Sequence, residues 1–291
     1  MASEWQVRQD IVEVGKRLWL KGFVAANDGN ISARLPDGTV IITPTGVSKG
    51  FMRPEDLVKV DLDGNRLAGS REPTTELPLH LSVYRERPDV GGVVHAHPPT
   101  ATGFAVAGIT VETAILPEAI LAFDGIPLAE YGTPGTEELV QSVMPYLKEH
   151  NAFLLANHGA LTLGADVMEA YYRMERLEMV AQISIIARVL GGERRLPEEA
   201  VERLRKAFER REETEERERK WREGLPWPCS DCMLASNCPA PNGGQSCRSQ
   251  SPQSSPQEGG LRAGSEEIEA IVARVAEEVL RELRGGNRGA P

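Results

Sequence analysis

The chain has 291 residues, 41% of them hydrophobic and 26% charged, and its formal net charge is −10. This composition supports a sizeable core, and the negative charge excludes nucleic-acid binding that depends on bulk electrostatics. No apolar run reaches the roughly 18 to 20 residues that span a membrane, and the first residues lack the pattern of a secretory signal. We therefore expect a cytoplasmic protein without a nucleic-acid or membrane partner, as the absence of cysteine before Cys229 also suggests.

The first third of the sequence predicts a helix, strands and two loops of small residues. Apolar side chains recur at helical spacing over residues 4–21, and Gly22 suits the end of this helix. Residues 25–34 predict a loop leading into a strand, and residues 40–46 a strand followed by a loop. Such loops can be plain turns, or their Gly, Asn and Thr residues can surround a phosphate without any Lys or Arg.

A carboxylate opens the next helical segment. Residues 57–65 alternate and then turn, which predicts a strand entering a hairpin. Glu76 begins a segment with helical periodicity that ends before Pro88, and the hydroxyl of Thr74 or Thr75 can cap it. A helix N-terminus with hydroxyl groups also suits a phosphate.

Two histidines spaced i, i+2 follow at the end of a predicted strand. His95 and His97 should project from one face of that strand, and His158 lies where another apolar strand meets Gly159. Each could be an ordinary hydrogen-bonded histidine. Together with Glu76 they could also bind a divalent metal with one position open to substrate, although spacing alone does not bring the four together.

The following segments complete an α/β pattern. Helices are expected at residues 99–107 and 136–148, and an edge strand is expected between them at residues 126–132. A long, well-buried helix is expected at residues 167–190. Asp166 should cap the long helix. Residues 111–126 show no clear pattern, and Glu118 among them is either a second functional carboxylate or a solvated residue.

The composition changes towards the C-terminus. Residues 197–221 are highly charged and predict an exposed helix with i,i+4 ion pairs. Residues 224–264 are rich in Pro, Ser, Gly and Gln and predict a flexible linker. Residues 265–284 predict an amphipathic helix that folds back on the main domain, self-associates or docks into a groove of another protein. The linker holds four cysteines that are either free thiols or ligands of a zinc or iron–sulfur site: Cys229, Cys232, Cys238 and Cys247.

Five motifs occur in an order and spacing that resemble the class II aldolase/adducin family, above all its L-fuculose-phosphate aldolases. They are Gly29-Asn30-Ile31-Ser32, Ile42-Thr43-Pro44-Thr45-Gly46, Thr74-Thr75-Glu76, Val94-His95-Ala96-His97 and Asn157-His158-Gly159. For residues 1–223 the resemblance implies an α/β fold, a three-layer α/β/α sandwich around a central mixed sheet. It also implies a homotetramer with active sites between subunits.

The resemblance further implies a zinc-dependent lyase. Zn²⁺ would be bound by His95, His97 and His158, with Glu76 as a resting ligand and the catalytic acid/base. The phosphate would be held by Gly29, Asn30, Thr45, Gly46, Thr74 and Thr75. The implied reaction reversibly cleaves a ketose 1-phosphate, such as fuculose 1-phosphate, to dihydroxyacetone phosphate and an aldehyde such as lactaldehyde.

Two departures from the fuculose enzyme leave the sugar open. That enzyme has a Tyr near the position of Leu116-Pro117-Glu118 and another in its tail, where this chain has Arg210-Arg211. Other members of the family are pentulose-phosphate 4-epimerases, which carry Asp at the position of Glu76, and a methylthioribulose-phosphate dehydratase. Adducin-like scaffolds keep the fold but lack the metal histidines.

The C-terminal extension resembles the encapsulation peptides that send enzymes into bacterial microcompartments, including those that degrade fucose and rhamnose. The resemblance implies that residues 265–284 bind a shell protein or a co-cargo enzyme.

Overall fold

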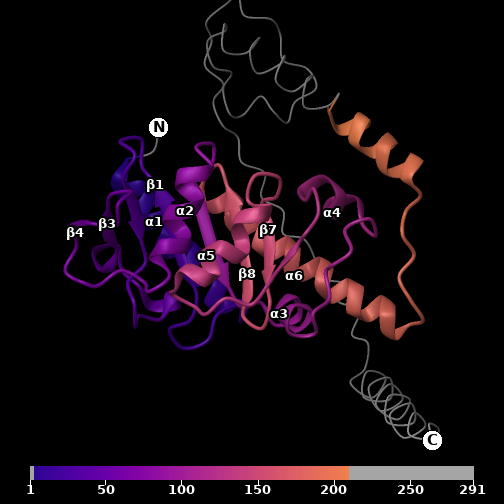
Figure 1. The fold of residues 1–291 in the computed structure, drawn as a ribbon, viewed down its shortest axis with the longest axis horizontal. Helices are drawn as coiled ribbons and strands as arrows, with labels where there is room; N and C mark the ends of the chain where they lie inside the picture. The colour runs from indigo at the N-terminus through magenta and orange to yellow at the C-terminus, as the bar shows by residue number, and fades with distance from the viewer. Residues whose placement is uncertain (1–2, 210–291) are drawn as a thin grey trace, which may run out of the picture. The chain divides into compact units, whose positions relative to one another are not determined.

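The computed structural model describes residues 3–209 (Figure 1). The expected linker, its four cysteines, Arg210-Arg211 and the predicted helix at 265–284 lie outside these residues. The helices are α1 (Glu4–Leu20), α2 (Leu77–Glu86), α3 (Pro99–Val106), α4 (Pro117–Ala122), α5 (Glu137–Val143) and α6 (Val167–Val189). The strands are β1 (Asn30–Arg34), β2 (Val40–Ile42), β3 (Val58–Val60), β4 (Arg66–Ala68), β5 (Gly92–Ala96), β6 (Leu128–Ala129), β7 (Ala152–Leu155) and β8 (Gly159–Gly164).

The strands of the described region form one mixed sheet in the order β4-β3-β2-β1-β5-β8-β7-β6. Neighbouring strands are antiparallel except β6 and β7, which are parallel. The expected edge strand is confirmed, because β6 lies at one end of this order. Strand β1 pairs with β5 in a register that sets Asn30 opposite His95, so the first small-residue loop ends beside the histidine strand.

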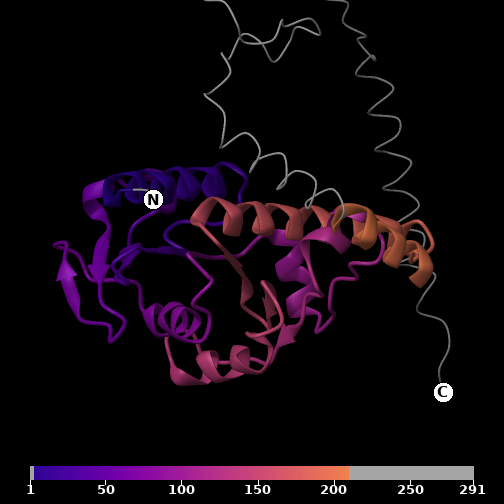
Figure 2. The ribbon, with the colours of Figure 1, turned by 90° about the horizontal axis from the view of Figure 1, so that it is seen from above.

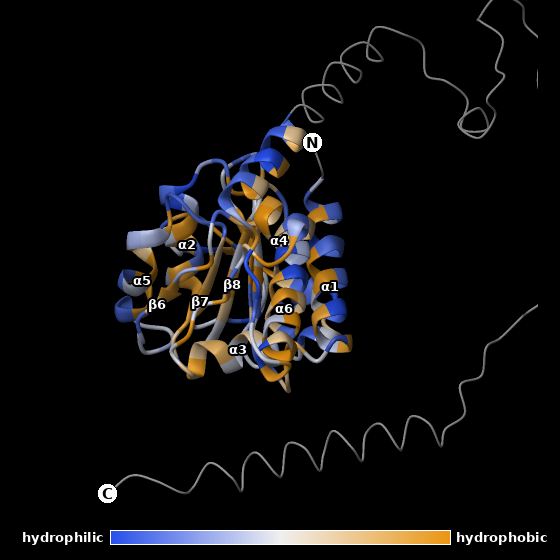
Figure 3. Cartoon of the chain, turned by 90° about the vertical axis from the view of Figure 1, so that its right-hand side faces the viewer, coloured by the Kyte–Doolittle hydropathy of each residue, from blue (hydrophilic) through white to orange (hydrophobic). Residues whose placement is uncertain are grey.

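Helices cover both faces of the sheet, which confirms the three-layer α/β/α fold (Figure 3). Alternate residues of a strand enter different cores because successive side chains point to opposite faces. In β7, for example, Leu154 packs in the core beneath α1, α3, α4 and α6, whereas Phe153 and Leu155 pack in the core beneath α2 and α5.

Side-chain caps set the starts of the two long helices. Ser3 Oγ accepts from Gln6 N at 3.2 Å at the start of α1. Asp166 Oδ1 accepts from Glu169 N at 2.8 Å, so the cap expected for α6 is confirmed. The stretch without a clear pattern contains α4, on which Glu118 is exposed, as a solvated residue would be.

Helix α6 lies beside α1 on one face of the sheet (Figure 2). The expectation that it is well buried is wrong for its C-terminal half, where Ile186, Val189 and Leu190 are 57%, 70% and 81% exposed. Its many apolar residues lie on more than one face, and the sheet covers only one of these. Residues 198–209 form a further helical segment of the predicted charged helix.

The described region has no helix with the length and apolar character needed to cross a membrane.

Candidate functional site

Three histidines come from the ends of neighbouring strands. His95 is the penultimate residue of β5, and His97 follows the strand, where its N–H donates to the Phe23 carbonyl at 2.8 Å. His158 lies in the turn between β7 and β8, directly after Asn157, whose φ of 56° is left-handed. Asparagine tolerates this conformation better than most residues, so the turn is tight enough to bring His158 back beside β5.

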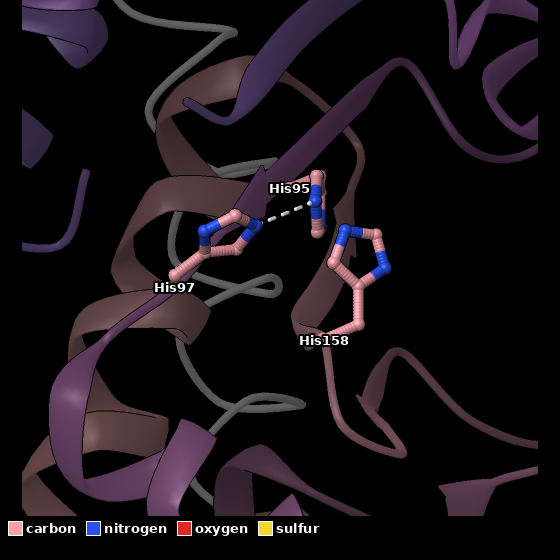
Figure 4. A group of neighbouring side chains, drawn as sticks. All are labelled: His95, His97 and His158. Carbon is pink, nitrogen blue, oxygen red and sulfur yellow. Dashed lines mark hydrogen bonds between the residues drawn. The ribbon is translucent and has the colours of Figure 1, made fainter. Parts of the chain in front are cut away.

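The three imidazole rings converge (Figure 4). One ring nitrogen of each lies within 4.8 Å of those of the other two, and the His97 and His95 Nε2 atoms are 3.2 Å apart. Gly159 makes this approach possible, because a Cβ at its position would lie 2.5 Å from His97 Cδ2. The expectation that His95 and His97 face the same way agrees with this arrangement.

The protonation of the cluster suits metal binding. The Nδ1 of His95 lies 2.9 Å from the Ala160 carbonyl oxygen, which only accepts, so Nδ1 carries the hydrogen and the Nε2 lone pair faces the cluster. Burial lowers the pKa of His95 to about 3 and also lowers the pKa of His97 and His158. All three are therefore neutral near pH 7, the form that a metal requires.

The Glu76 carboxylate lies against this cluster from the N-cap position of α2. Its Oε2 is 3.3 Å from His95 Nε2 and accepts from Asn30 Nδ2 at 2.6 Å, and its Oε1 is 3.5 Å from His158 Nε2. Within residues 3–209, Oε1 is buried without a hydrogen-bond partner. A buried carboxylate oxygen without a partner is costly, whereas a cation beside three lone-pair nitrogens would satisfy it. The donor set therefore fits a divalent metal.

The phosphate-binding candidates line the same pocket as these four residues. The pocket has a volume of about 180 Å³ and includes Gly29, Asn30, Thr45, Gly46, Thr74, Thr75, Glu76, His95, His97 and His158. The backbone at Gly29 and Gly46 has φ of 72° and 71°, which favours glycine. Thr74 Oγ1 accepts from Glu76 N at 3.3 Å and so supports the first turn of α2. A larger hollow of about 820 Å³ along α6 contains none of the predicted site residues.

The lining of the pocket also includes a lysine that was not among the predicted site residues. Lys49 is 2% exposed, and its Nζ donates to the carbonyls of Asn27 and Val47 at 2.7 and 2.8 Å. Burial lowers its pKa to about 8, although the charge of Asp28 opposes this shift. The pocket that was expected to hold a phosphate without Lys or Arg therefore has a lysine in its lining. A lysine in a polar loop gives no signal that the loop folds over it.

Comparison with known proteins identifies relatives along most of the described region. A family described as class II aldolase and adducin N-terminal domain matches residues 9–185. A 5-deoxy-D-ribulose 1-phosphate aldolase from Bacillus thuringiensis serovar kurstaki is 35% identical, over 69% of this chain and 95% of the relative. A 3-oxo-tetronate 4-phosphate decarboxylase from Escherichia coli O6:H1 is 33% identical, over 63% and 88%. A solved L-fuculose 1-phosphate aldolase superposes with a TM-score of 0.66 at 31% identity, over 72% and 98%.

Proposed function

Because the chain belongs to the class II aldolase and adducin family, we propose that it is a metal-dependent aldolase that reversibly cleaves a ketose 1-phosphate to dihydroxyacetone phosphate and an aldehyde. Its membership of the lyases is confirmed by the family match and by the aldolase relatives. The observation that carries the specific proposal is the Glu76 carboxylate beside three neutral imidazoles in one pocket. Two relatives are named for ketoses phosphorylated at carbon 1, which would share the dihydroxyacetone phosphate half.

The proposed metal is Zn²⁺, bound by His95, His97 and His158 with Glu76 as a ligand of the resting enzyme. Three imidazoles and a carboxylate are a common ligand set for zinc. When bound, the ion would polarise the ketose carbonyl and stabilise the negative charge that develops on its oxygen.

The side chains of the pocket would position the substrate and move one proton. Backbone and hydroxyl groups of the Gly29, Thr45 and Thr74 loops would hold the phosphate. The Glu76 carboxylate would accept the C4 hydroxyl proton as the C3–C4 bond breaks and the aldehyde forms, and the electron pair of that bond would stay with the phosphate-bearing fragment. The Glu76 carboxyl, within the same pocket, would then return that proton to C3 of that fragment.

A decarboxylase is the second candidate, because one relative is named 3-oxo-tetronate 4-phosphate decarboxylase. Both reactions break a C–C bond next to a carbonyl and leave negative charge behind, so one site could serve either.

Zinc-loaded protein would be incubated with the 1-phosphates of fuculose, rhamnulose, ribulose and 5-deoxyribulose, and separately with 3-oxo-tetronate 4-phosphate. Dihydroxyacetone phosphate released from a ketose 1-phosphate supports the aldolase. CO₂ released from 3-oxo-tetronate 4-phosphate, with no dihydroxyacetone phosphate from any ketose 1-phosphate, overturns it. Consumption of a substrate without either product would favour an epimerase or a dehydratase.

Lys49 should contribute to phosphate binding. Replacing it with Met is expected to raise KM for the phosphorylated substrate about 10-fold or more, as for loss of a charged donor. In the unmodified enzyme KM should rise as pH increases through about 8, because Lys49 loses its charge there. Steady-state kinetics from pH 7 to 9 measure both effects. Lys148→Met, at an exposed lysine, is the control, and an unchanged pH profile in Lys49→Met would contradict the role.

The chain is proposed to assemble as a homotetramer. The exposed apolar residues Ile186, Val189 and Leu190 on and beside α6 support association. Val189→Asp should therefore lower the mass measured by light scattering, while Lys148→Asp at an exposed site should not. If Val189→Asp leaves the mass unchanged, this surface is not part of the interface.

We further propose that residues 224–264 are a linker and that residues 265–284 direct the enzyme into a bacterial microcompartment. A fluorescent protein carrying residues 224–291 should form foci in cells that make the matching shell. Diffuse fluorescence in those cells would contradict this role.

A further inference from the structure

A histidine of α2, outside the cluster, is linked to Glu76 by side-chain hydrogen bonds through Asn30. His80 is fully buried on α2. Its Nε2 is hydrogen-bonded to Asn30 Oδ1, and Asn30 Nδ2 contacts Glu76 Oε2 at 2.6 Å. On the other side, His80 Nδ1 lies 2.6 Å from Ser32 Oγ, which lies 2.8 Å from the Tyr84 hydroxyl.

The direction of each hydrogen bond follows from what each group can donate. The Glu76 carboxylate accepts, so Asn30 must present its NH₂ group to Glu76 and its carbonyl to His80. That carbonyl also accepts, so the hydrogen of a neutral His80 lies on Nε2. Nδ1 is then the acceptor for Ser32 O–H, and Ser32 Oγ accepts in turn from Tyr84.

The surroundings keep this arrangement intact near neutral pH. Burial lowers the pKa of His80 to about 4, although the charge of Glu76 opposes this, and burial raises the pKa of Tyr84. Both groups therefore remain neutral. The Nε2–H group of His80 holds the Asn30 carbonyl on the side away from Glu76. Without this donor, the Asn30 amide could turn by 180°. Its carbonyl would then face the Glu76 carboxylate, and the two acceptors would repel each other.

We propose that His80 is a positioning residue that fixes the orientation of the Asn30 amide, so that Asn30 holds Glu76 Oε2 and leaves Oε1 directed at the histidine cluster. This inference rests on the proposed function, because it assigns Glu76 a working geometry. His80 acts through Asn30 and does not itself reach the cluster: its two ring nitrogens are occupied by Asn30 and Ser32.

Two amide substitutions separate the two sides of His80. In His80→Gln the amide nitrogen can take the place of Nε2 and donate to Asn30, whereas in His80→Asn the shorter side chain reaches only the Ser32 side. We expect His80→Asn to lower kcat about 10- to 100-fold, as small misplacements of a reacting group do. His80→Gln should stay within a few-fold of the unmodified enzyme. Equal losses in both variants would overturn the proposal.

A double-mutant cycle distinguishes positioning from a general structural role. If His80 acts through Asn30, His80→Asn should cause little further loss of kcat in an Asn30→Ala background. Independent, multiplying losses would contradict the proposal. The visible absorption spectrum of the Co²⁺-loaded protein gives a readout without substrate. His80→Asn and Asn30→Ala should change it alike, and an unchanged spectrum in His80→Asn counts against the proposal even if the protein proves not to be an aldolase.

A measurement on the unmodified protein covers the case in which His80→Asn does not fold. The ¹⁵N chemical shifts of the His80 ring near pH 7 report its tautomer. The proposal requires a neutral ring with hydrogen on Nε2. A neutral ring with hydrogen on Nδ1, or an imidazolium, would overturn it.

Discussion

Replacing Glu76 with Gln is expected to lower kcat for aldol cleavage by about 10²- to 10⁴-fold, the range typical of a lost general acid or base. Glutamine has nearly the same shape, and its carbonyl can still accept from Asn30, but it cannot carry a transferable proton. It also loses the negative charge of an oxygen that is buried without a hydrogen-bond partner in the described region. The melting temperature of the metal-free protein should therefore not fall.

The matched control for this substitution is Glu86→Gln, at an exposed carboxylate at the other end of α2. It should leave both kcat and the melting temperature unchanged. Initial rates of dihydroxyacetone phosphate release give kcat for each variant. If Glu76→Gln retained more than about a tenth of the unmodified kcat, Glu76 would not be the acid/base that the mechanism requires.

Alanine substitutions of the three clustered histidines should each abolish stable zinc binding. Loss of a residue that only supports a ligand typically lowers metal affinity about 10- to 100-fold. Loss of a ligand itself should lower the metal affinity further. Competition with a chromophoric chelator measures the affinity, and elemental analysis after dialysis measures the zinc retained. His95→Ala, His97→Ala and His158→Ala are all expected to lose the ion.

His150→Ala is the control for these variants, because His150 lies near Gly125 and outside the cluster. It should retain as much zinc as the unmodified protein. Zinc retained at full affinity in any one of the three cluster variants would exclude that histidine as a ligand.

The main features of the fold follow from local patterns in the sequence. Helical periodicity predicts α1 and α6, and Asp166 marks the start of α6. Burial of α6 was harder to predict, because periodicity identifies apolar residues without showing which of them meet the sheet. Val189 and Leu190 are apolar, yet they are exposed in the single chain.

The candidate site was predictable as a set of motifs, but its geometry was not. Glu76, His95 and His158 lie at the ends of different elements. The antiparallel pairing of β5 with β8 brings His95 near His158, and Glu76 at the start of α2 is held by Asn30, which pairs with His95 across β1 and β5. Such long-range pairing cannot be derived from spacing. His80 was missed for a different reason: a lone histidine on the apolar face of α2 resembles an ordinary core residue, and its partners Ser32 and Asn30 lie about fifty residues earlier in the chain.

Titration of metal-free protein with zinc, followed by measurement of dihydroxyacetone phosphate released from the ketose 1-phosphates, tests the central claim most directly. The account predicts that the metal-free chain is inactive and that the rate rises in proportion to added zinc and stops rising at one ion per chain. Release that is independent of zinc, or no release from any of these substrates at one zinc per chain, would contradict it.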